Sequence, residues 1–281
     1  MGKVPKEIQK SNKDDQFAPG FGLTRLFPFN VTFMGHPGVR STFNDDSFIP
    51  ARRNFLGELL VFWLGRRGLW KAFRAVRFRA AGQLPAPPAE LPYPVIFYAN
   101  HNTYWDGYLA HVVLRQVYGL EGYLMMDLRQ MRKFRFFRWA GVFSVDRENG
   151  RSAMRSLDYI ADELRKKPGR ALWLFPQGEI APQERRPLAF QGGLARLIRR
   201  TGPCYVYPVA VRYEFFSQPQ PEFLLSVGEA RFFSGQEKPE PRRLTAELEA
   251  ALETELATLK ADVETGQLAN FVTIIRGKSI Q

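Results

Sequence analysis

The sequence is poor in the residues that build disulfides and metal centres. It has one cysteine, Cys204, and three histidines in 281 residues. A single cysteine excludes an internal disulfide and favours a reducing compartment. No cysteine or histidine pair has the spacing of a zinc site. The composition therefore excludes a disulfide-stapled secreted domain and gives no sign of a zinc site.

Long hydrophobic runs are also lacking. No segment reaches the ~20 apolar residues that a helix needs to span a bilayer. The nearest run, FLGELLVFWLG at 55–65, is short and contains Glu58. The polar N-terminus has no apolar core of a signal peptide, and Lys6 breaks the myristoylation pattern. We therefore expect a cytoplasmic protein that associates with a membrane only peripherally.

Positive charge, by contrast, is in excess, with a net charge of +12 and 24 phenylalanines beside 5 tryptophans. Such a charge favours an anionic partner, either nucleic acid or an anionic lipid surface. Basic residues mixed with large apolar ones suit a membrane interface. The alternation of charged and aromatic residues at 129–141 would also suit RNA, but no RNA- or DNA-binding motif is present. Nucleic acid is therefore not the expected partner.

The chain divides into four expected parts. Residues 1–50 form an irregular arm, 51–75 a basic amphipathic helix, 76–236 the main domain, and 237–281 a helix and tail packed on that domain. Apolar, strand-like runs within 76–236 alternate with helical periodicity at 152–166 and 188–200. This alternation predicts an α/β fold, a single layered domain with a mixed, mostly parallel sheet flanked by helices.

The helix expected at 51–75 has two interpretations. Phe55, Leu59, Phe62, Trp63, Leu69 and Phe73 can share one broad apolar face, which arginines flank. That pattern is typical of a helix lying in a membrane surface. It is equally typical of a helix that faces the core and exposes a basic back.

The stretch FYANHNTYWDGYLA, residues 97–110, contains a possible catalytic pair. On an unbroken helix the side chains of His101 and Asp106 would diverge. They can meet if His101 lies in a strand-to-helix turn that Asn102 and Thr103 cap. A carboxylate would then orient the imidazole as a general base, at the strand end where α/β sheets bind ligands. A structural pairing at a helix start is the alternative.

Three further stretches could line the same site. FPQGE at 175–179 places Gly178 after a strand, where backbone N–H groups can approach an anion or an oxyanion. GVFSVDR at 141–147 ends in Arg147, which can bind a phosphate. VYPVAV at 206–211 contains Pro208, which indicates an edge strand or a bend lining the site.

Taken in order, these four blocks resemble the glycerolipid acyltransferases typified by 1-acylglycerol-3-phosphate acyltransferase. Residues 100–106 match N-H-x-S-x-x-D with Thr for Ser, 141–147 an apolar strand ending in Arg, 175–179 F-P-E-G-T/S, and 206–209 V-x-P-V. The resemblance covers roughly residues 76–215, and the order and spacing of the blocks make it fairly specific.

The resemblance implies a mechanism without a covalent acyl-enzyme. His101 would take the proton of an acceptor hydroxyl, and Asp106 would orient the imidazole. The hydroxyl oxygen would attack an acyl thioester, with acyl-CoA or acyl-carrier protein as co-substrate. Arg147 would hold the acceptor's phosphate, and Gln177, Gly178, Glu179 and Pro208 are the other expected substrate-binding residues. The family needs neither a metal nor a cofactor.

Two departures from the family pattern bear on the acceptor. Gln177 replaces a glutamate, and so keeps a hydrogen-bond acceptor and loses a charge. Glu179 replaces a small hydroxyl residue, and either supplies that charge or repels a phosphate. A lysolipid, lysophosphatidic acid first, is the leading acceptor. A phosphate-free hydroxyl on a glycolipid or glycosylated carotenoid is the alternative, and a non-catalytic lipid- or RNA-binding protein is the third possibility.

Overall fold

The computed structural model describes residues 48–237 and 239–278. The predicted arm at 1–50 lies outside the described residues except for its last three positions. The described chain begins beside the sheet, because the N–H of Ile49 donates to the hydroxyl of Ser144 at 2.7 Å.

Within the described residues, nine strands form one mixed sheet. Its order is β4-β3-β5-β2-β6-β7-β1-β9, and β8 also pairs with β6. The bounds are β1 Ala75–Ala80, β2 Val95–Ala99, β3 Glu121–Asp127, β4 Val142–Val145, β5 Arg170–Leu174, β6 Cys204–Glu214, β7 Glu222–Val227, β8 Arg231–Phe233 and β9 Val272–Arg276.

The sheet is mostly parallel, as predicted. All pairs from β4 to β6 are parallel, and so is the pair of β1 with β7. The pairs β6–β7, β6–β8 and β1–β9 are antiparallel. Strands β8 and β9 were not predicted. Strand β9 lies in the segment expected to be a tail, and its residues are mostly exposed, with only Ile275 buried.

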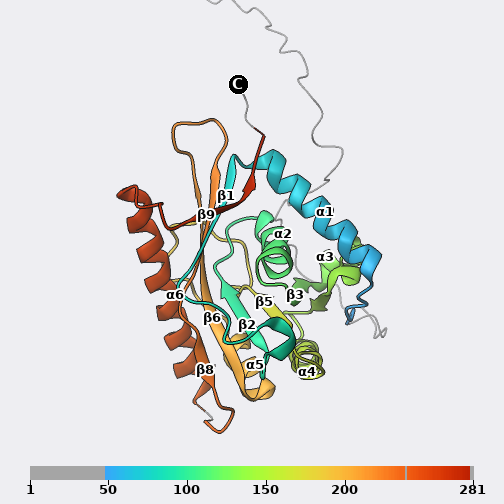
Figure 1. Ribbon diagram of the computed structural model, residues 1–281. Helices are drawn as coiled ribbons and strands as arrows, with labels where there is room; N and C mark the ends of the chain where they lie inside the picture. The colour runs from blue at the N-terminus through green and yellow to red at the C-terminus, as the bar shows by residue number, and fades with distance from the viewer. Residues whose placement is uncertain (1–47, 238, 279–281) are drawn as a thin grey trace, which may run out of the picture. The chain divides into compact units, whose positions relative to one another are not determined.

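Helices cover both faces of the sheet (Figure 1). One apolar core joins α1 and α2 to strand residues such as Phe97 and Trp173. The other joins α4, α5 and α6 to the alternate strand residues Ile96 and Leu172. Because successive strand side chains point to opposite faces, buried strands such as β2 supply both cores. The bounds are α1 Phe55–Ala72, α2 Trp105–Val112, a π-helical turn Val113–Val117, α3 Leu128–Lys133, α4 Gly150–Arg165, α5 Gly193–Thr201 and α6 Pro241–Glu264, with 3-10 turns at Pro88–Glu90 and Arg135–Ala140.

The expectation that Pro208 marks an edge strand is wrong, because β6 lies inside the sheet. Pro208 stands opposite Tyr98 of β2, and its carbonyl accepts the N–H of Gly228 at 2.9 Å. On its other side β6 changes partner, from β8 at Cys204–Val206 to β7 at Val209–Glu214. Proline is tolerated there because the missing N–H falls between the two antiparallel ladders.

Helix α1 has two apolar sides rather than the single broad face expected from its sequence. Its inner side buries Gly57, Val61, Gly65, Gly68 and Leu69. Its outer side exposes six large apolar side chains among the arginines Arg66 and Arg67. These six are Phe55, Leu56, Leu59, Leu60, Trp63 and Trp70.

Glycines on the inner side of α1 allow α2 to pack closely. A Cβ added at Gly65 would lie 2.9 Å from the ring of Tyr108, and one at Gly68 would lie 2.7 Å from the ring of Trp105. Because these glycines have no side chains, the aromatic rings of α2 fill the space. The large residues of α1 therefore face outward, which a search for one apolar face cannot foresee.

We expect Leu252→Ala in α6 to lower the free energy of unfolding by about 2–5 kcal/mol, since it opens a cavity in a packed core. Leu252 is fully buried, whereas Leu59 on the outer side of α1 is 44% exposed. The matched variant Leu59→Ala should cost about 0.5 kcal/mol or less. Urea unfolding without lipid measures both, and equal losses would contradict the outward orientation of α1.

Candidate active site

Three neighbouring strands bring the predicted site residues together. In the sheet, β2 lies between β5 and β6, and all three run parallel. Their carboxyl ends therefore meet at one edge of the sheet. His101 follows the end of β2, the segment 175–179 follows β5, and β6 continues past β2 to Glu214.

The predicted pair of His101 and Asp106 forms. Nδ1 of His101 lies 2.8 Å from Oδ2 of Asp106, which is in the first turn of α2. The same oxygen accepts the backbone N–H groups of Asn102 at 2.7 Å and Thr103 at 3.0 Å. Asp106 is 1% exposed, so these donors replace the water that a carboxylate would otherwise need.

This geometry fixes the tautomer of His101. An ionised carboxylate only accepts hydrogen bonds, so Nδ1 carries the proton and Nε2 carries the lone pair. The imidazole stacks on the ring of Phe175 at 4.2 Å between centroids, with 15° between the planes. The His101 side chain remains 20% exposed. The ring is thus held on one face and at Nδ1, and Nε2 is free to act as a proton acceptor.

Gln177 supports His101 from the third block. Its Oε1 accepts the backbone N–H of His101 at 2.7 Å, and the residue is almost fully buried. The carbonyl of His101 in turn accepts the N–H of Ala181 at 2.9 Å. The loop after β5 therefore holds the backbone of His101. The bond to His101 needs only an acceptor oxygen, which glutamine and glutamate both have.

Arg147 and Gly178 lie against each other. Gly178 has a φ of +73°, and a Cβ there would come within 3.3 Å of Nη1 of Arg147. Arg147 is 46% exposed, and its Nε lies 3.5 Å from Asp127. Glu179 points to Arg185 in an exposed ion pair of 2.6 Å, so its charge is balanced locally.

Two residues at this edge, Tyr213 and Asn100, were assigned no individual role from the sequence. Tyr213, near the end of β6, donates its hydroxyl proton to Oδ1 of Asp106. Asn100 extends the pairing of β2 with β6, since its side chain accepts from the N–H and donates to the carbonyl of Val211, both at 2.9 Å. Neither role has a local signal, because each depends on residues more than 100 positions away in the sequence.

Comparisons with known proteins identify a family and a similar fold. Residues 78–212 match the family model described as Acyltransferase. This part of the chain belongs to the acyltransferase family. The fold is similar to that of the 1-acyl-sn-glycerophosphate (LPA) acyltransferase PlsC from Thermotoga maritima, with a TM-score of 0.52 and 18% identity over 72% of this chain and 79% of that chain. No curated protein matches the sequence. The predicted membership in the acyltransferases is confirmed for this part of the chain, and the likeness to PlsC confirms the predicted fold.

Other candidate groups of this acyltransferase lie away from the His101–Asp106 pair. Burial raises the pKa of the Cys204 thiol to about 12, so it stays neutral and is a core residue. Burial likewise lowers the pKa of His111 to about 4. His36 lies outside the described residues. Pro208 lies within the sheet, level with Tyr98, and its contact with substrate stays a prediction.

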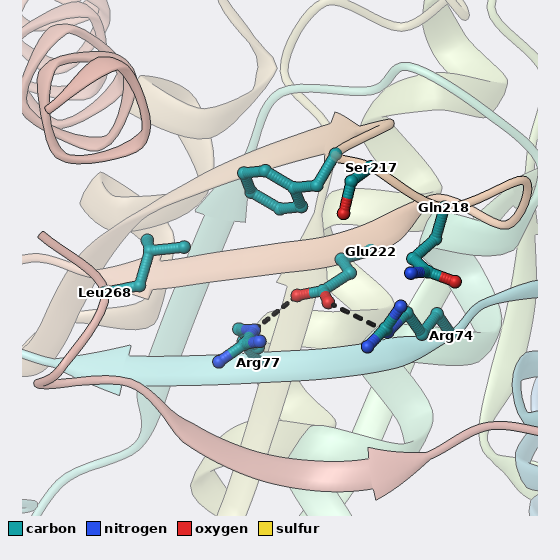
Figure 2. Close-up of a pocket in the computed structure, with 7 residues that line it drawn as sticks. Arg74, Arg77, Ser217, Gln218, Glu222 and Leu268 are labelled. Atoms are coloured by element: carbon teal, nitrogen blue, oxygen red, sulfur yellow. Dashed lines mark hydrogen bonds and ion pairs between the residues drawn. The ribbon is translucent and has the colours of Figure 1, made fainter. Parts of the chain in front are cut away.

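A separate hollow of about 230 Å³ opens at the start of β7 (Figure 2). In it, Arg74 and Arg77 both point to Glu222, with Nε of Arg74 3.6 Å from the carboxylate. Glu222 is almost fully buried, so the arginines compensate a charge that the fold itself contains. None of the predicted site residues of the acyltransferase lines this hollow.

Within 48–237 and 239–278, no group of acidic, histidine or cysteine side chains is arranged to hold a metal ion. In the same ranges, no helix of the acyltransferase combines the length and the apolar character required to cross a bilayer.

Proposed function

We propose that the protein transfers a fatty acyl chain from an acyl thioester to a lipid hydroxyl, with lysophosphatidic acid as the leading acceptor. The observation that carries the proposal is the buried Asp106 carboxylate, 2.8 Å from Nδ1 of His101. It orients an imidazole whose other nitrogen can accept a proton. Such a base-and-orienter pair is what attack by a hydroxyl on an acyl carbon requires.

In the proposed reaction, Nε2 of His101 takes the proton of the acceptor hydroxyl as its oxygen bonds to the thioester carbon. The tetrahedral intermediate then collapses, the carbon–sulfur bond breaks, and the imidazolium returns its proton to the leaving sulfur. The products are an ester and a free thiol. Asp106 stays ionised throughout and stabilises the imidazolium.

The proximity of Arg147 to Gly178 supports a phosphate on the acceptor. The guanidinium lies beside the turn that the resemblance assigns to the acceptor, and a guanidinium can bind a phosphate through two nitrogens. The pairing of Glu179 with Arg185 weighs against repulsion of that phosphate. A phosphate-free acceptor remains the second candidate, since Gln177 lacks the charge of the family's glutamate.

We also propose that α1 seats the enzyme peripherally on an anionic, cytoplasmic membrane surface. Its outer side is apolar, with Leu56 75% and Trp63 55% exposed, and Arg67 lies over the ring of Trp63 at 5.6 Å. Large apolar residues beside arginines are the composition of a helix that lies in a lipid interface. This pattern favours the membrane interpretation over the core-facing one.

The first test is thiol release from palmitoyl-CoA and from a palmitoyl-carrier protein, with a panel of acceptors. The panel contains lysophosphatidic acid, glycerol 3-phosphate, a neutral lysolipid and a glycosylated hydroxyl. We expect release with lysophosphatidic acid and a loss of about 100- to 10,000-fold in His101→Ala at an unchanged melting temperature. Release only with a phosphate-free acceptor would replace the acceptor. Undiminished turnover in His101→Ala would contradict the proposed base.

The role of Arg147 has a kinetic test. Arg147→Ala should raise the KM for lysophosphatidic acid about 10- to 100-fold, because a charged hydrogen bond to phosphate is lost. The KM for the donor should change little. Arg151→Ala removes an exposed arginine in the first turn of α4 and serves as the control. Equal effects of Arg147→Ala on both substrates would count against the assignment.

The membrane proposal is tested by sedimentation with vesicles of phosphatidylglycerol and phosphatidylcholine. Reversing Arg66 and Arg67 to glutamate should weaken binding at least tenfold, since each basic residue near such a surface contributes about 1 kcal/mol. The control reverses Arg242 and Arg243, exposed residues of α6 on the opposite face of the sheet. Equal loss in both pairs would indicate a general effect of net charge and no specific role for α1.

A further inference from the structure

The hydroxyl of Tyr213 contacts the one oxygen of Asp106 that the loop leaves open. Oδ2 of Asp106 accepts from His101, Asn102 and Thr103, which all lie within five residues of it. Oδ1 accepts from Tyr213, 107 positions along the chain. The carboxylate thus receives four hydrogen bonds, about the number that its lone pairs can accept.

The chemistry of the three side chains fixes which group donates each hydrogen bond in this cluster. The Tyr213 hydroxyl has a single proton, and the carboxylate can only accept, so that proton points to Asp106. The hydroxyl of Thr103, 2.8 Å from Tyr213, must then donate to the tyrosine oxygen. Thr103 in turn accepts the N–H of Trp105 at 3.0 Å. The hydroxyl in the first sequence block therefore holds Tyr213 in place.

Packing fixes the ring of Tyr213 as well. Its centroid lies 4.4 Å from that of Phe223 and 5.7 Å from that of Phe73. Burial, and then the charge of Asp106, raise the pKa of Tyr213 well above its ordinary value. The hydroxyl therefore keeps its proton and remains a donor over the working pH range.

We propose that Tyr213 is a positioning residue that holds Asp106 and thereby sets the basicity and orientation of His101. Acting through Asp106, the hydroxyl takes up part of the negative charge and stops the carboxylate from turning about its bond. The inference rests on the proposed acyl transfer, because it assigns to Tyr213 a part in preparing that reaction's base.

Loss of the hydroxyl should have two consequences. Oδ1 would be left buried without a donor, so the carboxylate would gain freedom to rotate away from Nδ1. The charge remaining on Asp106 would also favour the protonated imidazole, which cannot accept a proton. Both effects act on the chemical step and neither acts on substrate binding, so kcat should fall with little change in KM.

The experiment compares Tyr213→Phe with Tyr159→Phe. The hydroxyl of Tyr159 accepts the N–H of Ala51 at 3.1 Å on the opposite face of the sheet, so the control also removes one partly buried hydrogen bond. We expect Tyr213→Phe to lower kcat about 10- to 100-fold and to move the acid limb of the pH–rate profile to higher pH. Both KM values should stay within about twofold, and Tyr159→Phe should change neither kcat nor the profile.

A second readout is independent of turnover. The proton on Nδ1 of His101, hydrogen-bonded to Asp106, should give a low-field signal in the proton NMR spectrum. Tyr213→Phe should shift or broaden this signal, whereas Tyr159→Phe should not. Unchanged kcat and an unchanged signal would overturn the proposal, as would a raised KM at constant kcat. If the wild-type protein releases no thiol but Tyr213→Phe still changes the signal, the acyltransferase assignment is overturned and the positioning role is supported.

Discussion

The buried charge of Asp106 is the constraint on which the rest of the site depends. A carboxylate at 1% exposure is tolerated only when donors replace its hydration. Its donors come from the loop after β2 and from the end of β6. The buried charge is therefore compensated only when β2, α2 and β6 are in their final arrangement. The same contacts that satisfy the charge also aim the imidazole, so folding and site assembly are one process at this edge.

The parallel order β5-β2-β6 explains how distant sequence blocks cooperate. Parallel strands end at a common edge, so the residues that follow β2 and β5 meet although about 75 positions separate them. Gln177 holds the backbone of His101, and Phe175 stacks on its ring. The third block thus supports the first directly, whatever it does for the substrate. That structural use accounts for why glutamine suffices at position 177, since the bond needs an acceptor oxygen and no charge.

What the sequence could predict follows from how local each signal is. Apolar runs such as 94–100 and 171–176 indicate buried strands. The capping residues Asn102 and Thr103, with the spacing of His101 and Asp106, predict the turn between β2 and α2. Strand β9 has a short β-branched run, but it is largely exposed, and its pairing with the distant strand β1 has no local signal. Tyr213 ends an apolar strand and reads as one more core aromatic residue. Its role arises only because β6 extends several residues beyond the end of β2. No periodicity within a single strand indicates that extension.

Helix α1 packs directly against residues that surround the His101–Asp106 pair. This packing affects how a lipid could reach His101. Gly68 of α1 abuts Trp105, the residue before Asp106, and Phe73, which directly follows α1, packs against Tyr213. Packed helices have axes about 8–10 Å apart, and closer where glycines line the contact. If α1 lies in the lipid surface as proposed, the helix that bears Asp106 lies one helix layer below that surface. A lysolipid would then need to rise only a short way for its hydroxyl to meet His101, while its apolar chain stays close to the bilayer.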